Sequence, residues 1–487
     1  MEPKILATIK EKLSLIPSPE DIIKSSENWG FGEKSKKFIR EALEVESLGA
    51  MPFSMYDSPP IIESAGEGAL VYDIDGKAYI DMMAGFSVNN LGYGRNDILD
   101  AIIRQYKKIA QYSEMLTVDR VLLGKKLSEI TPGSFPKKVF YEVTGSGANE
   151  VAIKLARLYT GKQYIITQYG DYHGRTIGTS AFTHSFSTWA QHYPIPPHDT
   201  CVIRIPFPYC YRCPFGKSSH EECGEECFHL VEFMLSSSYY GVCDKSRRTC
   251  NIAAFLIEPF QSAAGYIIPP DNWIPKLHKI AKENDILFIV DEIQTGCGRT
   301  GKLWAVEHYP NVEPDIILVG KAIAGGLPFS VIVGRREIMD SWGPGAHSTT
   351  FAGYMLGVAA ALATIEIFER EKPELESARK GEYFLKGLRS LMDRHPIIGE
   401  VQGKGLYIGI EFVRNRHTKE PATTETKWMT MRLLQLGMLV KCSGYYRNRF
   451  ALSPPFTITY EQMDKAIEIF DTVLEEAEKN FSIPKNQ

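Results

Sequence analysis

The amino-acid sequence predicts an α/β protein with a large domain around a mostly parallel sheet and a smaller α+β domain. Between residues 101 and 345, short continuous apolar runs alternate with helical patterns, which is typical of strands covered by helices on both faces. The flanking stretches, 59–100 and 346–487, mix strand and helix patterns without this regular alternation. A chain of 487 residues is also long enough for about two or three domains.

The first elements belong to an N-terminal extension and to the first part of the smaller domain. Residues 1–58 contain short amphipathic stretches, and we find no motif among them that carries chemistry. The smaller domain begins in 59–100, where apolar and polar residues alternate around Asp75-Gly76. This alternation predicts a hairpin near residues 69–81.

The large domain, residues 101–345, contains the predicted parallel sheet and a cysteine-rich insert at about 207–250. Its apolar runs predict strands at 139–141, 164–166, 254–257, 286–290, 316–319 and 331–333. The C-terminal region, 346–487, begins with a long helix rich in Ala and Leu and continues with strands near 406–410 and 450–452. It closes with an amphipathic helix from Tyr460, and we expect it to pack with the N-terminal segment as the smaller domain.

The composition excludes several classes of protein. Fractions of 44% hydrophobic and 23% charged residues are those of a globular protein rather than a disordered chain or coiled coil. With 55 basic and 59 acidic residues, the chain has no overall positive field that would attract nucleic acid. No apolar run approaches the roughly 18 residues that span a bilayer, and Met1-Glu2-Pro3-Lys4 does not begin a signal peptide. We therefore expect a cytoplasmic protein without nucleic-acid or membrane partners.

Residues able to carry chemistry directly follow the predicted strands, at the sheet edge where α/β proteins bind ligands. Gly145-Ser146-Gly147 opens a helix after strand 139–141, and the free backbone N–H groups of such a helix start can bind a phosphate. A turn of this kind is equally often a tight turn without a ligand. Asp291 follows strand 286–290 and could equally cap a helix. Lys321 follows strand 316–319, where burial would lower its pKa and make its amine the nucleophile of a Schiff base.

An aromatic residue, Tyr172, follows the strand at 164–166 and adds a ring to the same sheet edge. A phosphate cradle, a carboxylate, a lysine and an aromatic ring are together the groups that bind pyridoxal 5'-phosphate (PLP). The sequence therefore predicts PLP as the cofactor.

The segments that carry these residues resemble the class III, or omega, aminotransferases, which are fold-type I PLP-dependent enzymes. The resemblance runs from about Pro59 to the end of the chain, apart from the cysteine-rich insert. Its most specific part is the segment from Asp291 to Gly301 together with Lys321. Supporting matches lie at 144–150, 172–176, 258–261 and 347–353.

The resemblance implies a role for each residue near the cofactor. Lys321 forms the Schiff base and moves the proton between the substrate carbon and the cofactor. Asp291 pairs with the pyridine nitrogen, and Gln294 contacts the 3-oxygen of the ring. Tyr172 stacks on the ring.

The resemblance also implies how the cofactor phosphate is held. The backbone amides of Ser146 and Gly147 form the cradle on one subunit. Thr350 reaches the phosphate from the other subunit, which implies a homodimer with active sites shared between the subunits.

The residues that contact the substrate are less clearly marked. Glu258 begins a Glu-Pro-x-Gln element and either contacts the substrate or holds neighbouring loops. Phe86 and Ser87 match a pocket-lining stretch, although Phe86 could equally belong to the core. Many members of the family have an arginine that binds the substrate carboxylate at the position where this chain has Ala451. Arg449 lies on the same strand face and either replaces that arginine or is an exposed strand residue without this role. This leaves open whether the substrate is an α-amino acid or an ω-amine.

These features predict a PLP-dependent aminotransferase. It would move an amino group from an amine or amino acid, with an ω-amino group preferred, to a 2-oxo acid such as pyruvate or 2-oxoglutarate by a ping-pong mechanism. The same scaffold supports amino-acid racemases or epimerases and amine lyases, since the Schiff-base lysine abstracts the α-proton in each. A purely regulatory PLP-binding protein is disfavoured, because Lys321, Asp291, Gln294 and Tyr172 are all present.

The cysteine-rich insert is outside the resemblance. An odd number of cysteines, nine, in a long chain without a signal peptide favours reduced thiols. Cys210, Cys213, Cys223 and Cys227 have a spacing that suits tetrahedral zinc, with free thiols or a redox-labile pair as alternatives. PLP chemistry needs no metal, so we assign none to the catalytic site.

Overall fold

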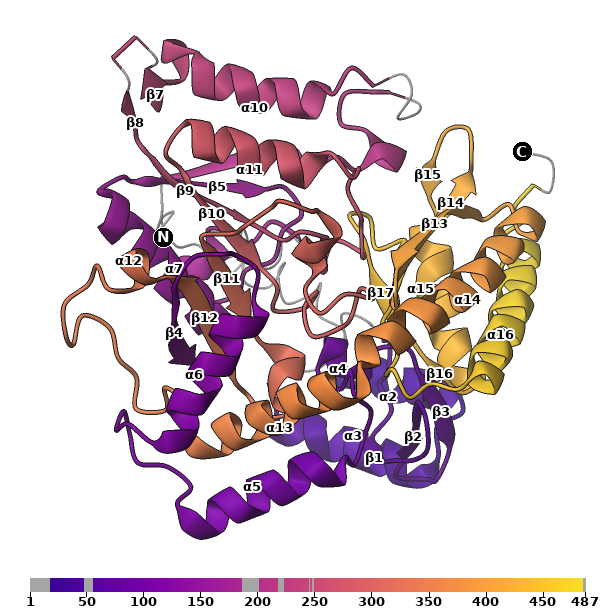
Figure 1. Ribbon diagram of the computed structural model, residues 1–487. Coiled ribbons are helices and arrows are strands. Elements are labelled where there is room, and N and C mark those ends of the chain that lie inside the picture. The colour runs from indigo at the N-terminus through magenta and orange to yellow at the C-terminus, as the bar shows by residue number, and fades with distance from the viewer. Residues whose placement is uncertain are drawn as a thin grey trace, which may run out of the picture.

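The computed structural model describes residues 18–47, 56–185, 201–217, 223–244, 246–247 and 249–484. Its centre is a seven-stranded sheet with the order β4-β12-β11-β10-β9-β5-β6 (Figure 1). The strands are β4 (Lys137–Glu142), β5 (Tyr164–Gln168), β6 (Val202–Ile205), β9 (Ile252–Ile257), β10 (Leu287–Asp291), β11 (Ile316–Val319) and β12 (Ser330–Arg335). Among these strands, β12 alone runs in the direction opposite to the other six. The predicted α/β class with a mostly parallel sheet is therefore confirmed.

The strands are continuous apolar runs because both faces of the sheet are covered. Along β10, Phe288 and Val290 belong to one hydrophobic core and Ile289 belongs to another. Successive side chains of a strand point to opposite faces, so this alternation places a core on each side. Two helices that pack on the sheet are α7 (Gly145–Thr160) and α11 (Trp273–Glu283).

Segments from both ends of the chain share a second sheet, with the order β1-β2-β3-β16. The predicted hairpin is β2 (Leu70–Asp73) and β3 (Ala78–Asp81), flanked by β1 (Ile62–Ala65). The partner on the far side of β3 is β16 (Met438–Leu439), which runs parallel to it. The helices of the N-terminal half are α2 (Pro19–Asn28), α3 (Glu33–Val45), α4 (Ala84–Ser87), α5 (Asn96–Lys108), α6 (Val118–Ile130) and α8 (Ile177–Ser180).

The C-terminal region contains a third sheet with the order β13-β14-β18-β17, and a short β15 pairs with β14. Its strands are β13 (Ile398–Lys404), β14 (Tyr407–Asn415), β15 (Glu420–Pro421), β17 (Lys441–Ser443) and β18 (Arg449–Leu452). Its helices are α13 (Met355–Glu371), α14 (Pro373–Arg394), α15 (Thr423–Gln435) and α16 (Tyr460–Asn480). Short helices earlier in the chain are η4 (Ala305–His308), η5 (Lys321–Ala324) and α12 (Arg336–Met339). No helix in the described ranges has the length and apolarity that a membrane crossing requires.

The cysteine-rich insert forms a separate layer over α11, at the top of Figure 1. It contains η2 (Cys210–Arg212), α10 (Glu226–Ser236), η3 (Ser238–Tyr240) and the hairpin of β7 (Cys243–Asp244) and β8 (Thr249–Cys250). Cys243 and Cys250 lie directly opposite each other in this hairpin and form a disulfide. The expectation that all the cysteines are reduced thiols is therefore wrong, because the hairpin register brings these two together. The other seven are free.

The four cysteines with zinc-like spacing do come together in the structure. Cys210, Cys213, Cys223 and Cys227 line one small cavity of about 30 Å³. Burial, reinforced by the neighbouring cysteines, raises the pKa of Cys227 to about 12. Within the described ranges, however, no group of three or more His, Cys, Asp or Glu side chains has an arrangement that could hold a metal ion.

Candidate active site

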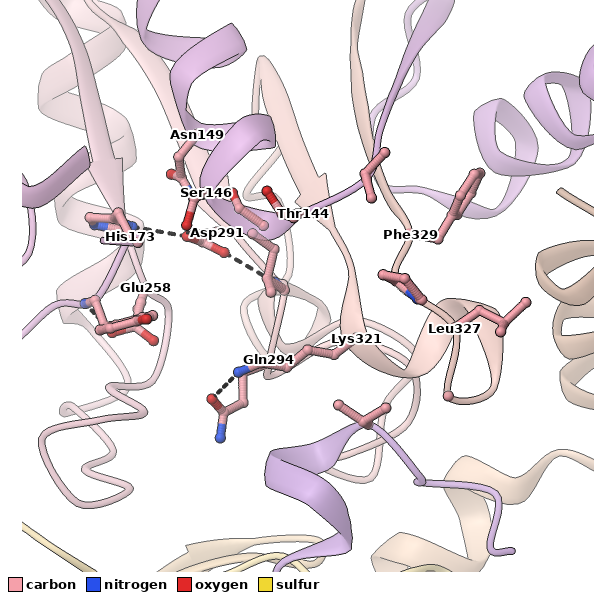
Figure 2. Close-up of a pocket in the computed structure, with 18 residues that line it drawn as sticks. Thr144, Ser146, Asn149, His173, Glu258, Asp291, Gln294, Lys321, Leu327 and Phe329 are labelled. Atoms are coloured by element: carbon pink, nitrogen blue, oxygen red, sulfur yellow. Dashed lines mark hydrogen bonds and ion pairs between the residues drawn. The ribbon is translucent and has the colours of Figure 1, made fainter. Parts of the chain in front are cut away.

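A cavity of about 420 Å³ lies at the carboxyl ends of the central strands (Figure 2). Strands β4, β5, β9, β10 and β11 each contribute the residues at or just beyond their last position. This is the edge where parallel strands converge and where α/β proteins bind their ligands. The cavity is lined by Val88, Val143, Thr144, Gly145, Ser146, Asn149, Tyr172, His173, Gly174, Glu258, Asp291, Ile293, Gln294, Lys321, Gly326, Leu327, Pro328 and Phe329.

Lys321 is the nucleophilic group of this cavity. It lies two residues beyond the end of β11, after Gly320, and has a positive φ of 47°, a strained conformation of the kind found at functional sites. Its amine donates a hydrogen bond to Gln294 Oε1 (Figure 2). Burial lowers the pKa of Lys321 to about 8, although the negative charges of Glu258 and Asp291 partly oppose the shift. About a tenth of the amine is therefore neutral at pH 7, far more than for a lysine with the ordinary pKa of about 10.4.

Asp291 is held in place by two neighbours. Its Oδ2 accepts hydrogen bonds from Asn149 Nδ2 and His173 Nδ1, both at 2.9 Å. Burial disfavours a charge on His173, but the hydrogen bonds to Asp171 and Asp291 outweigh it and raise its pKa to about 10. These hydrogen bonds use Oδ2 and orient the Asp291 side chain, which lines the cavity. A carboxylate in this position is a partner for a protonated ring nitrogen of a ligand.

The start of α7 forms the end of the cavity that suits a phosphate. Thr144 caps the helix, and its Oγ1 accepts a hydrogen bond from the backbone N–H of Gly147 at 3.0 Å. Gly145 and Ser146 line the cavity, whereas Gly147 does not. Their position in the first turn supplies N–H groups without helical partners and the positive end of the helix dipole. The structure thus places Ser146, but not Gly147, at the predicted cradle.

Tyr172 and Glu258 occupy one side of the cavity and are joined to each other. The backbone N–H of Tyr172 donates to Glu258 Oε2 at 2.9 Å. Burial, and then the charge of Asp171, raises the pKa of Glu258 to about 8. Glu258 therefore holds the Tyr172 loop, as one of the two expectations had it, and it also lines the cavity; its contact with the substrate remains a prediction.

Arg449 does not reach this cavity, and the expectation for it requires correction. It is fully buried rather than exposed on a strand. Its guanidinium pairs with Glu400 and Glu411, each at 2.9 Å, and donates to the carbonyl of Gly265 at 2.9 Å. Because Glu411 lies directly opposite Arg449 in the pairing of β14 with β18, the strand register itself provides the ion pair. Its buried Nη2 has no hydrogen-bond partner among the described residues, but the two carboxylates balance its charge without a substrate.

Three other predicted site residues lie outside the cavity wall. Phe86 and Ser87 end the short helix α4, each with a positive φ, and it is the next residue, Val88, that lines the cavity. Thr350 is exposed, and its carbonyl accepts a hydrogen bond from Gln111 Nε2 at 2.5 Å.

Sequence reasoning missed His173, Asn149 and Lys441. His173 and Asn149 lie inside the matching segments, but their link to Asp291 depends on three strands meeting at one edge. Lys441, at the start of β17, lies close enough to Lys321 for the two charges to repel. Its one sequence signal is a lysine directly after the apolar run Met438-Leu439-Val440.

The fold and this set of side chains define a PLP-dependent enzyme. Residues 54–474 match the model of the family described as aminotransferase class-III, and the chain belongs to that family. It is 37% identical to the leucine/methionine racemase of Thermococcus litoralis, over 86% of this chain and 92% of the relative. It is 33% identical to the acetylornithine aminotransferase of Methanothermobacter thermautotrophicus, over 89% of this chain and 98% of the relative.

The comparison with solved structures agrees. The structure resembles that of the omega transaminase from Pseudomonas jessenii in complex with PMP, with a TM-score of 0.80 and 26% identity. The similarity covers 92% of this chain and 96% of the other. The predicted family, fold class and PLP cofactor are therefore confirmed.

The residues around the cavity fit PLP. Lys321 provides an amine, Asp291 an anion for the ring nitrogen, and the first turn of α7 provides N–H groups for the phosphate. Within the described ranges, the buried Asn149 Oδ1 lacks a hydrogen-bond partner. A buried polar atom without a partner is costly, and a ligand in this cavity could satisfy it.

Proposed function

We propose that this protein is an aminotransferase that moves an amino group between an amine or amino acid and a 2-oxo acid. The observation that carries the proposal is the meeting of Lys321, Asp291 and Gln294 in one cavity of a class III chain. When bound, PLP supplies the aldehyde that takes up the amino group and a ring that withdraws electrons from the substrate carbon.

In this proposal Lys321 acts first as nucleophile and then as the group that moves a proton at the substrate carbon. Its lowered pKa, about 8, keeps part of the amine neutral at the start and makes it an effective base afterwards. Gln294 accepts a hydrogen bond from the amine and so fixes its direction.

The remaining cavity residues hold the cofactor and exclude water from it. Asp291, fixed by Asn149 and His173, would keep the ring nitrogen protonated. Tyr172 lies at the cavity wall, where it could cover the ring face, and Ser146 lies at the phosphate end.

A second candidate function is racemisation or epimerisation of an amino acid. Such a reaction removes the α-proton on one face and returns a proton on the other, so it benefits from two proton-transfer groups. Glu258 lines the same cavity as Lys321, and its pKa of about 8 makes it a proton donor near neutral pH. A racemase among the relatives adds support.

We also propose that the active enzyme is a homodimer. The exposed position of Thr350 supports this, because an exposed threonine is available to a second subunit. The exposed apolar side chains of Leu116, Val118 and Phe351 support the homodimer independently.

The test is a half-reaction with purified, PLP-loaded protein and a panel of amines and amino acids, in the absence of any 2-oxo acid. We expect the cofactor absorbance to change to that of the aminated form and to return when pyruvate or 2-oxoglutarate is added. An unchanged final spectrum with inversion of the substrate's configuration would replace transamination by racemisation. Released ammonia would instead identify a lyase.

A further inference from the structure

Lys441 is a cation beside the candidate active site that the proposed mechanism does not use. Its Nζ lies 5.2 Å from the ring centroid of Phe86 and 5.8 Å from that of Tyr266. The ion pairs and hydrogen bonds among the described residues include none to this amine. Lys441 is partly buried. A partly buried ammonium group without an anion beside it is unfavourable, so a negatively charged ligand would be stabilised here.

Lys441 does not line the cavity, but two side chains connect it to Lys321. The ring of Tyr266 is 5.8 Å from the Lys441 amine, and the Tyr266 hydroxyl accepts a hydrogen bond from Gln294 Nε2 at 2.8 Å. Gln294 in turn accepts a hydrogen bond from the Lys321 amine. Burial, and then the positive charge of Lys321, lowers the pKa of Lys441 to about 7, while Glu258 opposes the shift.

The strand register shows why this position can replace the missing arginine. Lys441 on β17 lies directly opposite Ala451 on β18. Opposite residues of an antiparallel pair lie on the same face, with Cβ atoms about 4.5–5.5 Å apart. Arg449, the other cation considered for this role, is already paired with Glu400 and Glu411.

We propose that Lys441 is a specificity-determining residue that binds the carboxylate of the substrate, so that the enzyme prefers amino acids and 2-oxo acids to simple amines. This inference rests on the proposed function. The aromatic rings of Phe86 and Tyr266 keep the lysine side chain in place while no substrate is bound, through cation–π contact. A carboxylate would supply the charge-assisted hydrogen bond that the amine lacks.

The first test compares L-leucine with 3-methylbutylamine, which is the same molecule without its carboxylate. For Lys441→Met, we expect kcat/KM for the amino acid to fall about 10- to 100-fold, as expected for loss of a hydrogen bond to a charged group. The value for the amine should stay within about 2-fold, while Lys441→Arg should retain the preference. Lys427→Met is the control, because it removes an exposed lysine from the neighbouring helix α15.

The second test measures binding without turnover. Calorimetry of 4-methylpentanoate with the PLP-loaded protein should show about 10-fold or greater weakening in Lys441→Met. In the wild type, binding should weaken as the pH rises through about 7, because Lys441 then loses its charge. Lys321, Glu258, Arg175 and Cys442 also face this amine, so the relevant quantity is the difference between wild type and variant at each pH.

The outcomes separate this proposal from the proposed function. Equal binding of 4-methylpentanoate by wild type and Lys441→Met would overturn the role of Lys441, as would an unchanged ratio between amino acid and amine. A wild type that converts neither substrate class would overturn the aminotransferase, yet the calorimetric comparison would still decide on Lys441. Lys441→Gln removes the same charge and replaces the methionine variant if that variant does not fold.

Discussion

Lys321 combines two properties that a surface lysine does not have. It is held at the end of β11 in a backbone conformation with positive φ, and its amine donates to a neutral amide rather than to a carboxylate. Both follow from its place between a buried strand and the turn that begins at Gly325. A lysine in this environment is available for nucleophilic attack, whereas an ion-paired lysine is not.

Replacing Lys321 by alanine should remove catalysis and leave the fold intact. We expect kcat to fall by at least about 10³-fold, because both the nucleophile and the proton carrier are lost. The measurement is the rate of the half-reaction at saturating substrate. Lys138→Ala, which removes an exposed lysine paired with Asp340, is the control. Turnover of Lys321→Ala at the wild-type rate would show that another group carries the chemistry.

Asp291 is oriented by hydrogen bonds from His173 and Asn149, and the contribution of each can be measured. Asp291→Asn keeps the shape of the side chain but cannot balance a protonated ring nitrogen, so kcat should fall about 10²- to 10³-fold. His173→Asn should produce a smaller loss, since Asp291 keeps its hydrogen bond from Asn149. Equal rates for wild type and Asp291→Asn would rule out the proposed pairing with the ring nitrogen.

The sequence indicates which residues gather at the strand ends, but not contacts between residues that are distant in sequence. Lys321, Asp291, Gln294 and Tyr172 all line the cavity, because each lies at or within four residues of the end of a strand, and their roles there remain predictions. Arg449 was misplaced because its ion pair depends on the register of β18 against β14. A single sequence contains no signal for that register.

At the scale of elements, the buried side chain of Glu292 connects β10 to the short helix η4. Its Oε1 accepts a hydrogen bond from the backbone N–H of Val306 at 2.7 Å, and its Oε2 accepts one from the hydroxyl of Thr295 at 2.5 Å. Burial raises the pKa of Glu292 to about 7, even though these hydrogen bonds oppose the shift. The loop from 292 to 308 is thus folded around a carboxyl group that prefers to be neutral.

Because the pKa of Glu292 is raised in the folded state, the free energy of unfolding should fall as the pH rises. The stabilisation by a neutral Glu292 is complete below its unfolded-state pKa of about 4.5 and is lost as the pH rises through about 7. Glu292→Gln remains neutral throughout. Between pH 5 and 8, the free energy of unfolding of the variant relative to wild type should therefore rise by about 2–3 kcal/mol. Urea unfolding at the two pH values measures this, and a pH-independent difference would contradict it.

The strands of the central sheet could be predicted, but their directions and some of their partners could not. A continuous apolar run has the same sequence pattern whether the strand lies parallel or antiparallel to its neighbours. The antiparallel orientation of β12 therefore could not be predicted from its own residues. The two residues of β16 pair with β3 across more than three hundred positions, and nothing in a two-residue segment indicates this. The disulfide between Cys243 and Cys250 likewise depends on the register of a short hairpin.

For the whole molecule, a group of exposed apolar side chains lies beside Thr350. Met115, Leu116 and Val118 are 60%, 83% and 74% exposed, and Phe351 is 55% exposed. The two segments are in contact, since the Thr117 hydroxyl donates to Met355 Sδ at 3.4 Å and Gln111 donates to the Thr350 carbonyl. Adjacent apolar side chains with such exposure are unusual on a monomer and typical of a subunit interface.

A charge in this patch should separate the subunits. We expect Leu116→Asp to sediment at half the mass of the wild type, because an unpaired carboxylate in an apolar interface carries a large desolvation cost. If Thr350 reaches the phosphate of a second subunit, as we propose, the separated chains should also retain PLP less tightly on dialysis. Tyr239→Asp is the matched control, because Tyr239 is 99% exposed on the cysteine-rich insert and should leave the mass unchanged. A Leu116→Asp variant with the mass and cofactor content of wild type would place the interface elsewhere.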